Sequence, residues 1–122
     1  MKILIVDDMS TMRRILKNAL RQLGYRNIEE AENGQLAFSK VRETPLDLII
    51  TDWNMPTMDG LGLLKAVRDD PNYKAIPVLM VTAQAEQKYV LEAIRAGATN
   101  YIVKPFTADT LKTKIDKIFV NK

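Results

Sequence analysis

Two kinds of segment alternate along the chain. The first kind is short and continuously apolar, and four such runs cover residues 3–6, 48–51, 78–82 and 101–103. Continuous apolar runs of this length are typical of strands in a parallel sheet that is covered on both faces. A fifth run, residues 27–31, mixes polar and apolar positions. We therefore expect it to form an edge strand.

The second kind of segment repeats apolar residues with helical spacing. The first such stripe consists of Met12, Ile15, Leu16, Ala19, Leu20 and Leu23. Ser10 precedes this stripe at a position that suits an N-cap, and Gly24 follows it where a helix stop belongs. Similar periodicity predicts four later helices, at about 34–43, 60–69, 86–96 and 107–120. Gly97 closes the fourth helix of the chain.

The alternation makes five βα units in succession. This order predicts an α/β domain with a parallel sheet, right-handed crossovers and helices on both faces. A chain of 122 residues has the size of one domain. We expect a single domain over residues 1–122, with no output domain attached.

The composition excludes several kinds of chemistry. The chain has no cysteine and no histidine, which rules out thiolate nucleophiles, disulfides, Ser-His-Asp triads and phosphohistidine carriers. The net charge of +3 is spread along the chain, so we expect no nucleic-acid partner. The leading apolar run is too short for a signal peptide, and no run approaches membrane-spanning length. We therefore expect a cytoplasmic protein without a membrane partner.

Polar side chains follow the predicted strands. The first strand ends in Asp7-Asp8, the third in Asp52, the fourth in Thr82 and the fifth in Lys104. Because ligands of open α/β sheets bind at the carboxyl ends of the strands, these side chains should face one crevice. Three carboxylates repel one another unless a cation joins them, and their oxygens suit magnesium. A phosphoryl group would then fit between this ion and Lys104, with Thr82 as a hydroxyl donor. Asp52, at the end of the central strand and ionised at neutral pH, is the natural nucleophile.

Four motifs contain these residues: ILIVDD at 3–8, TDWNMPTMDG at 51–60, VTA at 81–83 and YIVKPF at 101–106. Together they resemble the receiver domain of bacterial two-component response regulators, and the similarity covers essentially the whole chain. The resemblance implies a flavodoxin-like sheet with strand order 2-1-3-4-5. Within the family, the chain is most similar to the stand-alone regulators of chemotaxis.

The resemblance also implies a role for each site residue. Asp52 would be the phosphoacceptor, and Lys104, followed by a cis Lys-Pro bond, would bind the phosphoryl oxygens. Asp7, Asp8, Asp52 and the backbone carbonyl of Asn54 would hold Mg²⁺, for which Mn²⁺ can substitute. The protein would be a phospho-accepting signalling protein that catalyses its own phosphorylation and slow dephosphorylation, and not an enzyme acting on other substrates.

The switch and the partners follow from the same resemblance. Thr82 would move toward the phosphoryl group and Tyr101 would turn inward, while Asn54 and Gln84 would flank the attacking water. The phosphoryl donor would be a histidine kinase of the CheA type, and the output partner would be the flagellar motor switch protein FliM. A phosphatase would be a further partner, and the protein would be a monomer. The partner surface, on the fourth helix, fifth strand and fifth helix, would comprise Ala85, Val90, Tyr101, Val103, Phe106, Lys114 and Lys117.

Some positions carry two interpretations. An aromatic residue on an outer strand, such as Tyr101, is ordinarily half-buried packing, and only the resemblance makes it a switch. Trp53 is either surface packing or, because it follows Asp52, a reporter of metal and phosphate. The sequence departs from the family pattern in the fourth helix and the loop before it, at Gln84, Gln87, Tyr89 and Ile94.

Three other functions stay open at this point. A magnesium-dependent aspartyl-phosphate phosphohydrolase would commonly have a second aspartate where Asn54 stands. A flavin-binding electron carrier would need a Ser/Thr/Gly-rich phosphate loop after the first strand, where this chain has two aspartates. A receiver can also act as a phosphate sink or on a target other than the motor.

Overall fold

The computed structural model describes residues 1–83 and 87–119. The strands in this part of the chain form one five-stranded parallel sheet. Its strands are β1 (Lys2–Val6), β2 (Asn27–Ala31), β3 (Leu48–Asp52), β4 (Val78–Thr82) and β5 (Asn100–Val103). They lie in the order β2-β1-β3-β4-β5, so the predicted class and strand order are confirmed. β2 lies at an edge, as its mixed polarity predicts.

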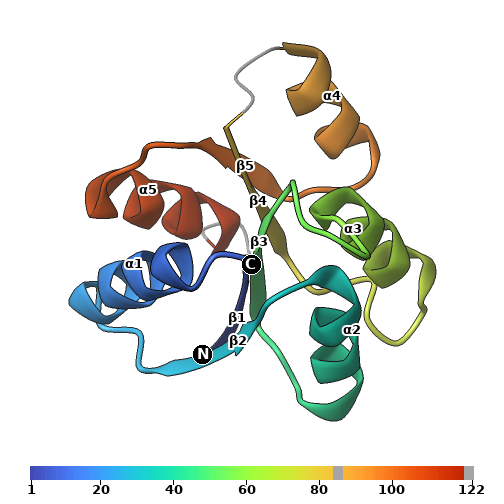
Figure 1. Cartoon of the computed structure of the whole chain (residues 1–122), viewed down its shortest axis with the longest axis horizontal. Coiled ribbons are helices and arrows are strands. Elements are labelled where there is room, and N and C mark those ends of the chain that lie inside the picture. The colour runs from blue at the N-terminus through green and yellow to red at the C-terminus, as the bar shows by residue number, and fades with distance from the viewer. Residues whose placement is uncertain (84–86, 120–122) are drawn as a thin grey trace.

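Five helices connect and follow these strands. They are α1 (Ser10–Gln22), α2 (Gly34–Glu43), α3 (Gly60–Asp69), α4 (Gln87–Arg95) and α5 (Ala108–Phe119). Figure 1 shows α1 and α5 on one side of the sheet and α2, α3 and α4 on the other. The structure ends α4 at Arg95 and begins α5 at Ala108, so the predicted bounds 86–96 and 107–120 are each one residue too wide at that end. Residues 86 and 120, at the other ends, lie outside the described part of the chain.

The strand residues alternate between two cores. Ile3 and Ile5 pack with buried residues of α1 and α5, whereas Leu4 and Val6 pack with those of α2 and α3. Every residue of β3 and β4 is buried. Since both faces of these strands are covered, their sequences read as continuous apolar runs and not as alternating ones.

Two glycines end helices as predicted. Gly24 after α1 has φ +96° and Gly97 after α4 has φ +104°. After α1, the Gly24 N–H donates to the Arg21 carbonyl and the Tyr25 N–H donates to the Leu20 carbonyl, both at 3.0 Å. This is a Schellman motif, whose left-handed residue favours glycine.

The predicted N-cap at Ser10 is wrong. Ser10 is the first helical residue of α1, and Met9, in an extended conformation, occupies the capping position without a side-chain hydrogen bond. The helical ladder already begins at Met9, whose carbonyl accepts from the Arg13 N–H. The loop after β1 is so short that the helix starts one residue earlier than the preference for serine at N-caps suggests.

Candidate phosphorylation and metal site

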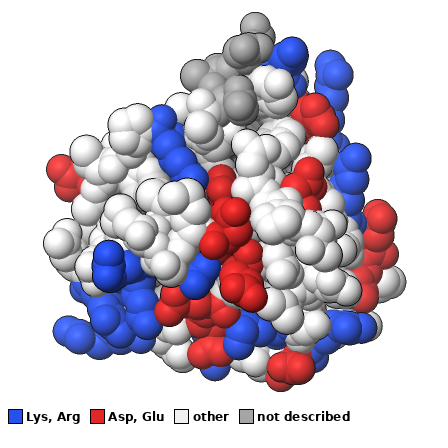
Figure 2. All heavy atoms as spheres, in the orientation of Figure 1, with Lys and Arg blue, Asp and Glu red and all other residues white. Residues whose placement is uncertain are grey.

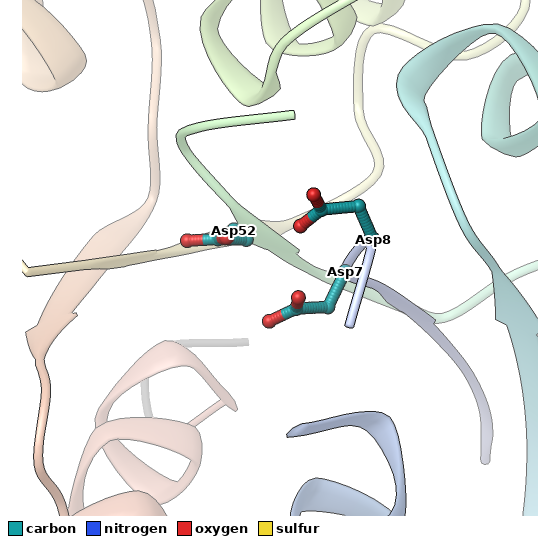
Figure 3. Close-up of side chains that lie close together, drawn as sticks. All are labelled: Asp7, Asp8 and Asp52. Carbon is teal, nitrogen blue, oxygen red and sulfur yellow. The ribbon is translucent and has the colours of Figure 1, made fainter. Parts of the chain in front are cut away.

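Three carboxylates meet where β1 and β3 end. Asp7 and Asp8 follow β1, and Asp52 is the last residue of β3. One oxygen from each lies within 4.8 Å of the others. Asp7 is 1% and Asp52 8% exposed, whereas Asp8 is open to solvent. Figure 3 shows the three side chains turned to the same side, so the sequence-based prediction that they share one crevice is correct.

Lys104, which follows β5, brings a positive charge to this cluster. Its ammonium lies 3.3 Å from Asp52 Oδ1 and 3.5 Å from Asp7 Oδ2. The bond between Lys104 and Pro105 is cis, as the resemblance implies. Within residues 1–83 and 87–119, Lys104 is the one cation that forms an ion pair with any of the three carboxylates, and it pairs with Asp7 and Asp52. The cluster therefore keeps an excess of negative charge, and Figure 2 shows acidic atoms gathered across the middle of this face.

The electrostatics of Asp52 reflect this crowding. Burial raises the pKa of its carboxyl above the ordinary value, and the charge of Asp7 raises it further, against the opposing effects of Lys104 and of the Trp53 N–H. That N–H donates to Asp52 Oδ1 at 2.9 Å. A buried carboxylate beside another carboxylate fits a divalent cation, because carboxylate oxygens are the donors that hard cations prefer. The donor set Asp7, Asp8 and Asp52 therefore fits the implied ion.

Asn54 lies in the loop between β3 and α3, beside the carboxylates. Its side chain is exposed. A hollow of about 360 Å³ is lined by Asp8, Asn54, Met55, Pro56 and Asp59. The Asp59 side chain caps α3 by accepting from the Gly62 N–H at 2.8 Å. The open hollow leaves this side of the cluster accessible from solvent.

The two predicted switch residues lie on neighbouring strands. Thr82 ends β4 and is 2% exposed, and its carbonyl accepts from the Lys104 N–H at 2.8 Å. Tyr101 in β5 is half-buried, with the Lys114 ammonium 4.7 Å from its ring centroid. The switch roles of these two residues stay predictions, and Tyr101 equally fits half-buried packing on an outer strand.

The described residues of the predicted partner surface are all at least partly exposed. Val90, Val103, Phe106 and Lys114 are half-buried, and Lys117 is exposed. Leu91 and Ile94 of α4 add two exposed apolar side chains, at 41% and 46%. Gln84 and Ala85 lie outside the described residues.

Trp53 does not lie on the surface. Only 8% of it is exposed, and its indole packs edge-on against the ring of Tyr89 in α4, with centroids 5.8 Å apart. The surface-packing interpretation of Trp53 is therefore wrong. Its position beside Asp52 and under α4 is compatible with the reporter interpretation.

Sequence reasoning missed Arg13. Its guanidinium donates to the Asp7 carbonyl at 2.6 Å and pairs with Glu30 at 3.2 Å. Arg13 therefore joins the residue that follows β1 to strand β2. The sequence feature that could have identified Arg13 is its place in the first turn of the helix that follows Asp7 and Asp8.

Comparison with known proteins identifies the family. The model of the response regulator receiver domain matches residues 3–116. This chain is a receiver domain. The predicted family is thus confirmed, and with it a place among the signalling proteins of two-component systems.

The most similar relatives include chemotaxis proteins. Over 119 residues the chain is 56% identical to chemotaxis protein CheY-3 of Vibrio cholerae. The matched region covers 98% of the chain and 92% of that protein. The chain is also 56% identical over 119 residues to chemotaxis protein CheY of Pseudomonas aeruginosa, covering 98% and 96%. The receiver is therefore of the CheY type.

Solved structures agree with this placement. CheY4 of Vibrio cholerae superposes with a TM-score of 0.89 at 36% identity, covering 97% of this chain and 98% of that one. A putative response regulator from Chloroflexus aurantiacus gives 0.92 at 34% identity, covering 98% and 97%. In the described part of this receiver, no helix combines the length and the apolar character needed to cross a bilayer.

Proposed function

We propose that this receiver is a stand-alone chemotaxis response regulator that accepts a phosphoryl group on Asp52 in a magnesium-dependent reaction. The observation that carries the proposal is the meeting of Asp7, Asp8 and Asp52 with Lys104 at the carboxyl end of the sheet. The 56% identity to CheY proteins supports the assignment to chemotaxis. The protein acts as a single-domain monomer in the cytoplasm.

Asp52 is the nucleophile. Its carboxylate oxygen attacks the phosphorus of a phosphohistidine on the donor, so that the P–O bond to Asp52 forms as the P–N bond to the donor breaks. Asp7, Asp8, Asp52 and the carbonyl of Asn54 hold Mg²⁺ or Mn²⁺, which when bound offsets the negative charges of the carboxylates and the phosphoryl group. Lys104 binds phosphoryl oxygens from the other side.

The output lies on α4, β5 and α5. Phosphorylation shifts a population between two conformations, because contacts of the phosphoryl group with Thr82 and Lys104 favour one of them. Tyr101 turns inward in that state. The donor is a histidine kinase of the CheA type, and the favoured state binds the flagellar motor switch protein FliM and so controls flagellar rotation. A phosphatase and the pair Asn54 and Gln84 set the lifetime of the phosphoryl group.

The test uses Trp53 as a probe. Magnesium and then acetyl phosphate are added to the wild type, to Asp52→Asn and to the control Asp59→Asn, and fluorescence and protein mass are followed. We expect the wild type and the control to gain the mass of one phosphoryl group and to change in fluorescence. A wild type that stays unmodified, or an Asp52→Asn variant that is modified equally, contradicts the proposal.

A second experiment addresses the output. A peptide from the N-terminus of the switch protein is used to pull down the receiver with and without beryllofluoride as a phosphoryl mimic. We expect binding to rise with the mimic. Equal binding in both states would leave Asp52 phosphorylation standing and redirect the output to a phosphate sink or a target other than the motor.

A further inference from the structure

The loop between β3 and α3 is closed tightly at both ends. The Trp53 N–H donates to the Val81 carbonyl at 3.1 Å, and the Gly60 N–H donates to the Trp53 carbonyl at 2.8 Å. A Cβ on Gly60 would clash with the Asp52 carbonyl oxygen. Asn54, whose carbonyl is the proposed fourth protein ligand of the ion, lies inside this closed loop. A displacement of the middle of the loop is therefore transmitted along a few bonds to Asn54.

The middle of the loop has a conformation that needs support. Thr57 has φ +73°, and across it the Met58 N–H donates to the Pro56 carbonyl at 2.9 Å. This is a three-residue turn with a β-branched residue at positive φ, which is sterically unfavourable by itself. Contacts from outside the loop must stabilise it.

Gly34, the first residue of α2, supplies such a contact. Its N–H donates to the Met58 carbonyl at 3.0 Å. In the described residues, this is the backbone hydrogen bond that joins residues 55–58 to another element of the fold. The bond links the start of α2, at the sheet edge next to β2, to the loop that carries Asn54.

Gly34 leaves no room for a side chain. A Cβ at this position would lie 2.5 Å from the Met58 carbonyl oxygen and 2.8 Å from Met58 Cγ. Gly34 does not have a positive φ; the glycines that do are Gly24 and Gly97. Alanine would thus suit the backbone conformation and favour the helix. The close approach to Met58 is the reason for glycine here.

We propose that Gly34 is a positioning residue of the metal site, acting through Met58 to keep the loop seated and Asn54 beside the carboxylates. The inference rests on the proposed function, in which the Asn54 carbonyl is a ligand. Residues that orient metal ligands without touching the ion typically change affinity about 10- to 100-fold when they are replaced. We expect Gly34→Ala to weaken magnesium binding at least about tenfold, although all three carboxylates remain.

The test is a magnesium titration followed by Trp53 fluorescence, with the free energy of unfolding measured separately in chelator. The matched control is Gly24→Ala, which introduces strain at φ +96° with no heavy atom within 4 Å of the new Cβ, at the end of α1 away from the site. We expect the control to lose stability and to bind magnesium as the wild type does. Gly34→Ala should bind more weakly.

Each outcome is informative. A wild type that does not respond to magnesium overturns the proposed function itself. A responding wild type with an equal response of Gly34→Ala, or an equal weakening in Gly24→Ala, overturns the role of Gly34 alone. If Gly34→Ala does not fold, the double variant Gly34→Ala/Met58→Ala is compared with Met58→Ala. The double variant loses the clash with Met58 Cγ and keeps the close contacts with the carbonyl oxygen at 2.5 Å and with Cβ at 3.0 Å. Equal magnesium affinity of these two variants overturns the inference.

Discussion

Replacing Asp52 by asparagine is expected to stabilise the protein in the absence of metal. The substitution keeps the shape of the side chain and removes its charge. The Trp53 N–H, now 2.9 Å from Asp52 Oδ1, can donate to the amide oxygen instead. The change therefore isolates the electrostatic cost of an ionised carboxylate at this position.

The magnitude follows from the distances. At an effective dielectric constant of about 20, attraction by Lys104 at 3.3 Å is worth about 5 kcal/mol. Repulsion by each carboxylate, whose nearest oxygen lies within 4.8 Å, is then about 3.5 kcal/mol at the upper limit of that separation. Solvent screens the repulsion that exposed Asp8 contributes, while the burial of Asp52 adds to the free-energy cost of its charge. The raised pKa of Asp52 shows that the balance is unfavourable to the charge. We expect a gain of about 1 kcal/mol or more for the variant.

The pH dependence has a definite sign. A carboxyl whose pKa is higher in the folded state favours folding most below its ordinary pKa, near 3.8. This contribution is lost as the pH rises through the folded-state pKa of Asp52. The advantage of Asp52→Asn in chelator should therefore be largest above the folded-state pKa of Asp52 and should shrink as the pH falls through it toward the ordinary value of 3.8.

Urea denaturation in chelator and in magnesium checks this reasoning. In chelator, Asp52→Asn should be more stable than the wild type, and the control Asp59→Asn, which keeps a capping side chain on α3, should match the wild type. Saturating magnesium should reverse the order, since an ion at 100 times its Kd adds about 2.7 kcal/mol to the protein that binds it. A variant less stable than the wild type in chelator would refute the claim that crowded charges oppose folding here.

Three further predictions concern residues around the site and opposite it. Thr57→Asn should raise the free energy of unfolding by about 1 kcal/mol, because asparagine tolerates φ +73° better than threonine; a lower midpoint in urea would contradict this. Arg68→Lys should cost about 2 kcal/mol, because the half-buried guanidinium donates to the carbonyls of Gly97, Lys74 and Ile76, and unchanged stability would refute it. Tyr89→Ala should shift Trp53 emission to longer wavelength by exposing the indole, whereas the control Tyr73→Ala, which disrupts the ring pair with Phe38, should not.

The sequence predicted those parts of the fold that depend on local pattern. Strand positions, their order and the placement of Asp7, Asp8, Asp52 and Lys104 at one rim follow from burial on both faces and from the geometry of parallel strands. Contacts between distant elements were beyond it. The buried Trp53 indole packs against Tyr89 of α4, and no spacing along the chain predicts that pair.

Backbone details failed for a related reason. Ser10 looked like a cap because serine commonly is one, yet the length of the loop after β1 decides where α1 begins. The positive φ of Thr57 contradicts its local preference and is maintained by neighbouring chain segments. Local propensity is therefore least informative at the rim where the proposed chemistry takes place.

The features that oppose folding are concentrated at that rim. Asp52 and Asp7 are buried close together, Thr57 has an unfavourable backbone conformation, and Gly34 and Gly60 replace side chains where main chains approach closely. At the other end of the sheet, Arg68 has found hydrogen-bond acceptors on three carbonyls. A binding-dependent switch requires a site that is unfavourable when empty, on a stable scaffold. A cation and a phosphoryl group can shift a conformational equilibrium only if they bind one conformation more favourably than the other. Stabilising the rim by mutation should therefore weaken the response to ligands, whereas stabilising the Arg68 end should leave it unchanged.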